Sequence, residues 1–181
     1  MTHPYTIPNL LTALRIVLIP AVVVLFYLPY SWSDMACGLM FALAGITDSF
    51  DGYLARRLGQ VSPLGAFLDP VADKLMVAVA LVLLVSRDPH WYVTMTAAVI
   101  IGREIAISAL REWMAELGAG KSVAVAFVGK LKTTAQMTAI IALLLYEPLI
   151  PGVSTPLLGT VALWLAAILT LWSMVHYLKK A

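Results

Sequence analysis

Four aspartates are the residues of this sequence whose spacing points most directly to chemistry. Asp48 and Asp51 stand three positions apart in one apolar stretch. Asp69 and Asp73 stand four positions apart in the next apolar stretch. Steps of three and four residues place side chains on one face of an α-helix. Ionisable groups within membrane-spanning helices face the protein interior or a water-filled cavity, so the four aspartates indicate a functional site.

Small residues accompany the aspartates on the same helical faces. Gly52 and Ala55 follow Asp48 by four and seven positions, and Gly65 precedes Asp69 by four. A missing or minimal side chain lets the backbone and a ligand approach closely. Each small residue taken alone would more simply mark a helix-packing position. Their combination with the aspartates favours a ligand site.

The register of the two segments follows from the turn between them, Gly59 to Pro63. In a hairpin that turns near residue 60, Asp51 lies level with Asp69, and Asp48 lies level with Asp73. At about 1.5 Å per residue, the carboxylates would converge about 13–18 Å from the turn. We therefore expect one site, inside the protein but near its surface.

Such a cluster of carboxylates requires positive charge. Two carboxylates 4 Å apart repel by about 4 kcal/mol at an effective dielectric constant of about 20. Oxygen ligands on rigid helices suit hard divalent cations such as Mg²⁺ or Mn²⁺. We predict that two such ions bind here and bridge phosphoryl oxygens. The spacing alone also leaves open a proton relay or a structural ion pair.

The elements that position these residues are long apolar helices. The chain has 181 residues, of which 61% are hydrophobic and 12% charged, so it is built for lipid. In lipid the backbone must satisfy its own hydrogen bonds, which favours helices over open strands. We expect an all-α integral membrane protein forming a single domain over residues 1–181. Six segments reach the length of about 20 residues that a span requires: 10–29, 35–56, 67–86, 91–112, 122–146 and 156–178.

The distribution of basic residues predicts the orientation. Lysine and arginine are absent near residues 30–34 and 147–155 and are concentrated on the alternate connections, which the positive-inside rule assigns to the cytoplasm. We expect both termini in the cytoplasm, an active site that faces it, and a location in the inner membrane. The N-terminus lacks the features of a cleaved signal peptide, so the first span should be retained. A net charge of +2 does not indicate nucleic acid, and the single cysteine, Cys37, excludes an intrachain disulfide.

The aspartate region carries a resemblance to a known family. The pattern Asp-x2-Asp-Gly-x2-Ala-Arg-x8-Gly-x3-Asp-x3-Asp is met in full by residues 48–73, and it resembles the signature of the CDP-alcohol phosphatidyltransferases. The resemblance implies a six-helix membrane fold, usually homodimeric, with two divalent ions that bind the pyrophosphate of a CDP-linked donor. It makes Asp73 the candidate general base. It assigns Gly52, Ala55, Arg56 and Gly65 to the nucleotide side of the donor.

The N-terminal segment adds Asn9, Thr12 and Arg15 at steps of three residues. The residues themselves predict a helix start at the membrane interface, in which Asn9 caps the helix and Arg15 snorkels, about as readily as they predict ligand contact. The segment is similar to the Asn-x-x-Thr-x-x-Arg sequence that borders the CDP site in the family. The resemblance therefore implies that Asn9 and Thr12 bind the donor.

Four basic residues lie in the cytoplasmic halves of the fourth and fifth segments. Arg103 is placed in an otherwise apolar run, and its neighbour Glu104 points about 100° away on a helix. Cations that face the aspartates would bind a phosphorylated acceptor. The alternative is that these basic residues only mark the cytoplasmic ends of the spans, as the positive-inside rule describes. The candidates for the acceptor phosphate are Arg103, Arg111, Lys130 and Lys132.

The stretches around these cations, residues 103–115 and 129–136, resemble the bacterial phosphatidylglycerophosphate synthases. That resemblance implies a reaction of CDP-diacylglycerol with sn-glycerol 3-phosphate that releases CMP. A sibling enzyme with another acceptor, such as serine or inositol phosphate, is the alternative within the family. A sibling that uses serine or inositol would share the aspartates but would not need the cations. A transporter or proton channel would need polar residues in the outer half of the spans, which are almost absent. An inactive scaffold is disfavoured because the motif is complete.

Overall fold

The computed structural model describes residues 7–58, 63–116, 126–146 and 154–178. Within them it describes the side chains of residues 10–47, 65, 67–110, 112–114, 116, 133–146 and 154–175. These residues form six α-helices and, across the described ranges, no β-strand. The helices are α1 (Ile7–Tyr27), α2 (Ser33–Leu58), α3 (Pro63–Arg87), α4 (Trp91–Glu116), α5 (Ala126–Leu145) and α6 (Thr155–Leu178).

Each predicted apolar segment corresponds to one of these helices. The largest differences include the start of the third helix and the end of the fourth, which continues to Glu116 beyond the predicted end at residue 112. The third helix begins at Pro63, four residues before its apolar stretch, because proline fits the first turn of a helix, where its missing N–H is not needed. The described part of the fifth helix begins at Ala126, and residues 122–125 of the predicted segment lie outside the described residues. The all-helical prediction is confirmed for the described residues.

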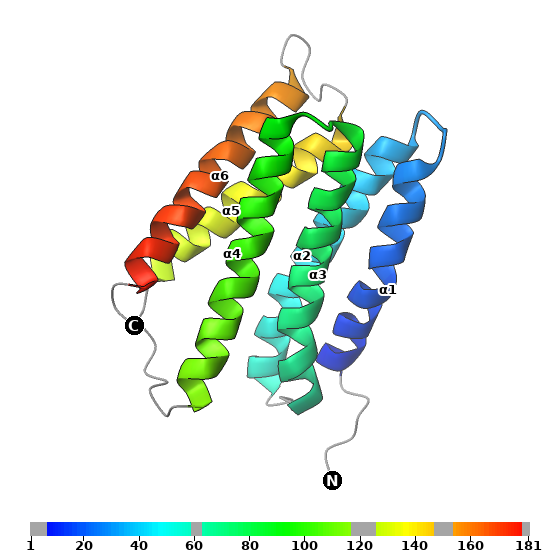
Figure 1. Ribbon diagram of the computed structural model, residues 1–181. Coiled ribbons are helices and arrows are strands. Elements are labelled where there is room, and N and C mark those ends of the chain that lie inside the picture. The colour runs from blue at the N-terminus through cyan, green and yellow to red at the C-terminus, as the bar shows by residue number, and fades with distance from the viewer. Residues whose placement is uncertain (1–6, 59–62, 117–125, 147–153, 179–181) are drawn as a thin grey trace.

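The helices pack as an alternating bundle. In Figure 1 they run up and down in turn, so that the start of α1 and the end of α6 lie at the same end of the bundle. The packed pairs include α1 with α2 and α3, α2 with α5, and α6 with both α4 and α5. Because α1 contacts α3 as well as α2, residues far apart in sequence meet at the lower end in Figure 1.

The core of the bundle is apolar and closely packed. The largest fully buried apolar side chains come from α2 to α6, and each contacts neighbours on other helices: Phe41, Leu81, Ile100, Ile140, Leu144 and Leu163. Glycine allows the closest approach between two helices, α2 and α5. A Cβ added at Gly38 in α2 would lie 2.6 Å from the Cγ of Leu145 in α5, closer than any real contact. Small residues serve the same purpose wherever helices associate in membranes.

The outward-facing side chains are apolar as well. Large hydrophobic residues are exposed along α1, α4 and α6, a surface that suits lipid and not water. Within the described residues, three helices contain stretches that are long and apolar enough to cross a membrane: Leu10–Tyr27, Trp91–Met114 and Thr155–Val175. Shorter apolar stretches occupy Ser33–Thr47 in α2 and Thr133–Leu145 in α5. The chain is therefore a membrane protein.

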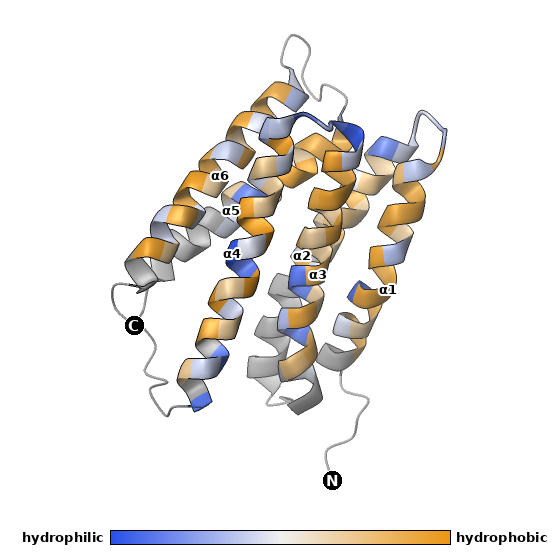
Figure 2. Cartoon of the chain, in the orientation of Figure 1, coloured by the Kyte–Doolittle hydropathy of each residue, from blue (hydrophilic) through white to orange (hydrophobic). Residues whose placement is uncertain are grey.

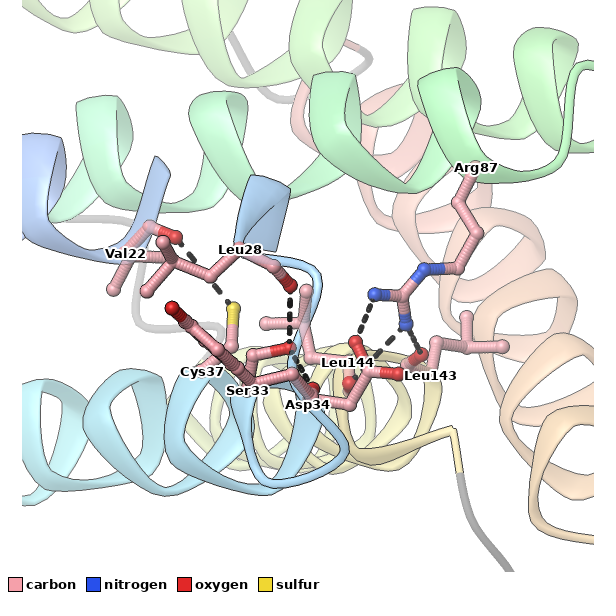
Figure 3. Close-up of polar contacts among 9 residues, drawn as sticks. Val22, Leu28, Ser33, Asp34, Cys37, Arg87, Leu143 and Leu144 are labelled. Atoms are coloured by element: carbon pink, nitrogen blue, oxygen red, sulfur yellow. Dashed lines mark hydrogen bonds and ion pairs between the residues drawn. The ribbon is translucent and has the colours of Figure 1, made fainter. Parts of the chain in front are cut away.

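Arg87, the last residue of α3, contacts three other helices, and Figure 3 shows its polar contacts with α2 and α5. Its guanidinium forms an ion pair with Asp34 at the start of α2. Its Nη1 donates to the carbonyl oxygens of Leu143 and Leu144, at 3.4 and 3.3 Å, near the end of α5. The guanidinium carbon also lies 4.3 Å from the ring centre of Phe26 in α1. These contacts satisfy carbonyl groups that the end of a helix leaves unpaired.

Candidate active site

Thr12 and Asp69 connect the N-terminal motif to the aspartate motif. The Thr12 hydroxyl in α1 donates a hydrogen bond to the Asp69 carboxylate in α3. Thr12 is fully buried, with 0% of its surface exposed, and Arg15 one turn later is 2% exposed. This burial contradicts the alternative in which Arg15 snorkels to the membrane surface. The N-terminal segment therefore lies against the predicted site.

Asp73 lies one turn beyond Asp69 on the same helix and borders a cavity of about 50 Å³. Its walls come from three helices. They comprise Asp73, Lys74 and Val77 of α3, Glu104 of α4, and Thr133, Gln136 and Met137 of α5. Figure 2 shows hydrophilic positions in the lower halves of α1, α3 and α4, within otherwise apolar helices. The lower end of the bundle is thus a polar region enclosed by apolar segments.

Several predicted site residues lie outside the described side chains. Asp48 and Asp51 are part of α2, which contacts both α1 and α3, but their side chains are not among those described. The predicted level pairing with Asp69 and Asp73 therefore remains a prediction. Gly65 is buried in α3. The other residues predicted to bind the donor also fall outside the described side chains: Asn9, Gly52, Ala55 and Arg56.

The donor atoms that are described fit a hard divalent cation. Asp69 receives a hydrogen bond from Thr12, and metal-binding carboxylates are typically oriented by such partners. Asp69 and Asp73 supply carboxylate oxygens from consecutive turns, the ligand type that Mg²⁺ and Mn²⁺ prefer. Among the side chains that the structure describes, no three acidic, histidine or cysteine residues form one group. A complete ligand set would therefore require Asp48 and Asp51.

Arg103 has partners within the protein. Its Nη1 lies 2.9 Å from Glu104 Oε1, and its Nη2 donates to Ser173 Oγ in α6 at 3.0 Å. The expectation that Glu104 points away from Arg103 is wrong, because both side chains are long enough to meet although their Cβ atoms diverge. Arg103 thus links α4 to α6, and it does not line the cavity beside Asp73.

The contacts of the other three predicted cations are not described. Arg111 belongs to α4, and Lys130 and Lys132 belong to α5, but their side chains are outside the described set. The same helices contribute residues that the sequence did not single out, namely Glu104, Thr133 and Gln136. The signal for Thr133 and Gln136 was their spacing of three residues within an apolar span. That spacing places both on one helical face.

Comparisons with known proteins identify the family to which the chain belongs. The profile of the CDP-alcohol phosphatidyltransferase family matches residues 5–172. A protein of Pectobacterium atrosepticum is 54% identical over 178 residues, which cover 98% of this chain and 95% of that relative. Relatives from Salmonella choleraesuis and Shigella flexneri are each 54% identical over 177 residues, with the same coverage. All three are named CDP-diacylglycerol–glycerol-3-phosphate 3-phosphatidyltransferase. The chain therefore belongs to the CDP-alcohol phosphatidyltransferase family.

Proposed function

We propose that this protein transfers the phosphatidyl group of CDP-diacylglycerol to sn-glycerol 3-phosphate, giving phosphatidylglycerophosphate and CMP. The observation that carries the proposal is the 54% identity with enzymes of that name over 98% of the chain. The complete aspartate motif and its contact with Thr12 support the same reaction class. The product places the protein in phospholipid biosynthesis.

The aspartates are proposed to hold two divalent ions, Mg²⁺ or Mn²⁺. The ligands would be Asp48 and Asp51 from α2, together with Asp69 and Asp73 from α3. When bound, such ions neutralise the negative charge of a pyrophosphate and of its leaving group. The Thr12 hydroxyl fixes the orientation of the Asp69 carboxylate. The proposed contacts to the donor are Asn9, Thr12, Gly52, Ala55, Arg56 and Gly65.

Asp73 is proposed as the general base. It borders the cavity between α3, α4 and α5, where an acceptor hydroxyl would be within reach of its carboxylate. Asp73 takes the proton of that hydroxyl, the oxygen attacks the phosphorus that carries the diacylglycerol, and the bond from this phosphorus to CMP breaks. A positioned base contributes about 10²–10⁴-fold to such a step.

The acceptor phosphate is assigned to cations at the same end of the bundle. Arg111, Lys130 and Lys132 are the proposed ligands, because guanidinium and ammonium groups bind phosphate strongly. Arg103 supports this region differently. Its ion pair holds Glu104, which forms part of the cavity wall. Its Nε has no hydrogen-bond partner among the described residues, so Arg103 stays a proposed ligand of the acceptor phosphate beside that pairing.

The membrane arrangement is part of the proposal. We place all six helices across the inner membrane, with both termini and the active site on the cytoplasmic side, in a single domain over residues 1–181. The alternating bundle supports this placement, because the start of α1 and the end of α6 share one end (Figure 1). The basic residues of the alternate connections support it as well. A homodimer is proposed from the family resemblance.

The proposal is tested by measuring CMP release from CDP-diacylglycerol by the purified protein in detergent. Serine, inositol phosphate and sn-glycerol 3-phosphate are compared at equal concentration, with Mg²⁺, Mn²⁺ or a chelator. We expect release only with glycerol 3-phosphate and a divalent ion. Release with serine or inositol phosphate, but not with glycerol 3-phosphate, would contradict the proposal that glycerol 3-phosphate is the acceptor. Full release in the presence of chelator would contradict the metal requirement.

A further inference from the structure

Gln136 is a buried amide whose oxygen is left unsatisfied. Its side chain lies in α5 and is 4% exposed. The Oε1 atom has no hydrogen-bond partner among the residues that the structure describes. Leaving a buried polar atom without a partner costs free energy, and most buried polar atoms in native proteins have a hydrogen-bond partner. A group that arrives during function is one explanation for such an atom.

The surroundings of Gln136 indicate what that group is. Gln136 borders the same cavity as Asp73, the proposed base. The cavity volume of about 50 Å³ exceeds the roughly 10–15 Å³ that a single water needs, so it admits a group of several atoms. Oε1 itself is fully buried, so it would meet a group in the cavity after the terminal amide turns about its last side-chain bond. An amide oxygen only accepts hydrogen bonds, so the group that pairs with it there must donate one. A hydroxyl is such a group, whereas an ionised phosphate oxygen is not.

We propose that Gln136 is a specificity residue that accepts a hydrogen bond from the secondary hydroxyl of glycerol 3-phosphate. This inference rests on the proposed function. The acceptor has three polar groups: a primary hydroxyl that loses its proton to Asp73, a phosphate, and a secondary hydroxyl on the carbon between them. With the first two groups held at Asp73 and at the cations, the secondary hydroxyl is the remaining donor. It is bonded to the carbon next to the one that bears the attacking oxygen, which places it in the cavity that Gln136 shares with Asp73.

The test compares two acceptors that differ only in this hydroxyl. They are sn-glycerol 3-phosphate and 3-hydroxypropyl phosphate, the monophosphate of 1,3-propanediol. In the wild-type protein, kcat/KM should be about 100-fold higher for glycerol 3-phosphate, because the analogue leaves Oε1 unpaired. Gln136→Met should lower kcat/KM for glycerol 3-phosphate about 100-fold and change it less than about threefold for the analogue. The ratio is measured within one preparation, so it does not depend on the folded fraction.

Thr170 provides the matched control. It is a second fully buried residue whose polar atom, Oγ1, has no partner in the described part of the chain, but it lies in α6 and does not border the cavity. Thr170→Val should leave the acceptor ratio unchanged. Gln136→Asn, which keeps the amide but shortens the side chain, should lower the ratio even if Gln136→Met does not fold.

Two results would overturn the inference. One is an unchanged acceptor ratio in Gln136→Met or Gln136→Asn, and the other is an equal loss with both acceptors, which would make Gln136 a structural residue. The wild-type protein alone decides the proposed function, because it either uses glycerol 3-phosphate or does not. A wild-type protein that uses glycerol 3-phosphate and the analogue equally well would overturn the role of Gln136 and leave the proposed function intact.

Discussion

Thr12 in α1 donates a hydrogen bond to the carboxylate of Asp69 in α3, across a separation of 57 residues. The bond is formed where α1 packs against α3, and Thr12 is fully buried there. The N-terminal motif and the second half of the aspartate motif thus meet at one position. Because a neutral hydroxyl cannot neutralise Asp69, this contact orients the carboxylate and leaves its charge available to a cation.

Thr12→Val should raise the concentration of divalent ion that the reaction requires. Valine has a similar shape but cannot donate to Asp69, and loss of a partner to a metal ligand typically costs about 10–100-fold in metal affinity or activity. We expect the Mg²⁺ or Mn²⁺ concentration for half-maximal CMP release to rise by about that factor. Thr12→Ser, which keeps the hydroxyl, is the matched control and should stay close to wild type. An unchanged metal requirement in Thr12→Val would show that the hydrogen bond does not serve the metal.

Arg87→Met should destabilise the fold without changing acceptor choice. The substitution leaves Asp34 without its ion-pair partner and removes the hydrogen bonds to Leu143 and Leu144. The two charged side chains are only 18% and 32% exposed, so we expect a loss of about 2–3 kcal/mol. Thermal unfolding in detergent measures this loss. Asp34→Asn should cost less, because Arg87 keeps its bonds to α5. Equal unfolding temperatures for Arg87→Met and wild type would contradict this role.

Gly38→Ala tests the close contact between α2 and α5. The added Cβ would lie 2.6 Å from Cγ and 3.1 Å from the backbone nitrogen of Leu145, so the helices must separate. Overpacking of this kind costs about 1–3 kcal/mol. Gly102→Ala is the control, since a Cβ there meets nothing within 4 Å. Unfolding in detergent should show a lower midpoint for Gly38→Ala only, and the opposite order would refute the packing described.

Lys130 and Arg103 should respond differently to substitution. Lys130→Met removes a proposed phosphate ligand, so KM for glycerol 3-phosphate should rise about tenfold or more while KM for CDP-diacylglycerol stays constant. Arg103→Met removes the contacts to Glu104 and Ser173, so thermal stability should fall. Steady-state kinetics and unfolding on the same preparations separate the two effects. A rise in acceptor KM for Arg103→Met at wild-type stability would show that Arg103 binds the phosphate directly and would contradict a purely structural role.

The helices were predictable because their signals are local. Apolar length alone locates the helix that contains Arg103, and the i, i+4 step alone places Asp69 and Asp73 on one face. The contact of Thr12 with Asp69 was not predictable, because it depends on how α1 packs against α3. The pairing of Arg103 with Glu104 was missed for a different reason. The direction of a Cβ on a helix does not determine where the end of a long side chain lies.

Gln136 shows the limit of sequence reasoning within the candidate site. Its position in a polar stretch of α5 is visible in the sequence, but its burial and its unsatisfied oxygen are properties of the packed bundle. Only the cavity that it shares with Asp73 connects it to the reaction.

The most direct test of the proposed phosphatidyl transfer follows isotope-labelled glycerol 3-phosphate into lipid. Purified protein is reconstituted in vesicles with CDP-diacylglycerol and Mg²⁺ or Mn²⁺, and the lipids are analysed by mass spectrometry. We expect labelled phosphatidylglycerophosphate in equal amount to the CMP released, and none with Asp73→Asn. Unlabelled lipids beside continued CMP release, or undiminished labelling by Asp73→Asn, would contradict it.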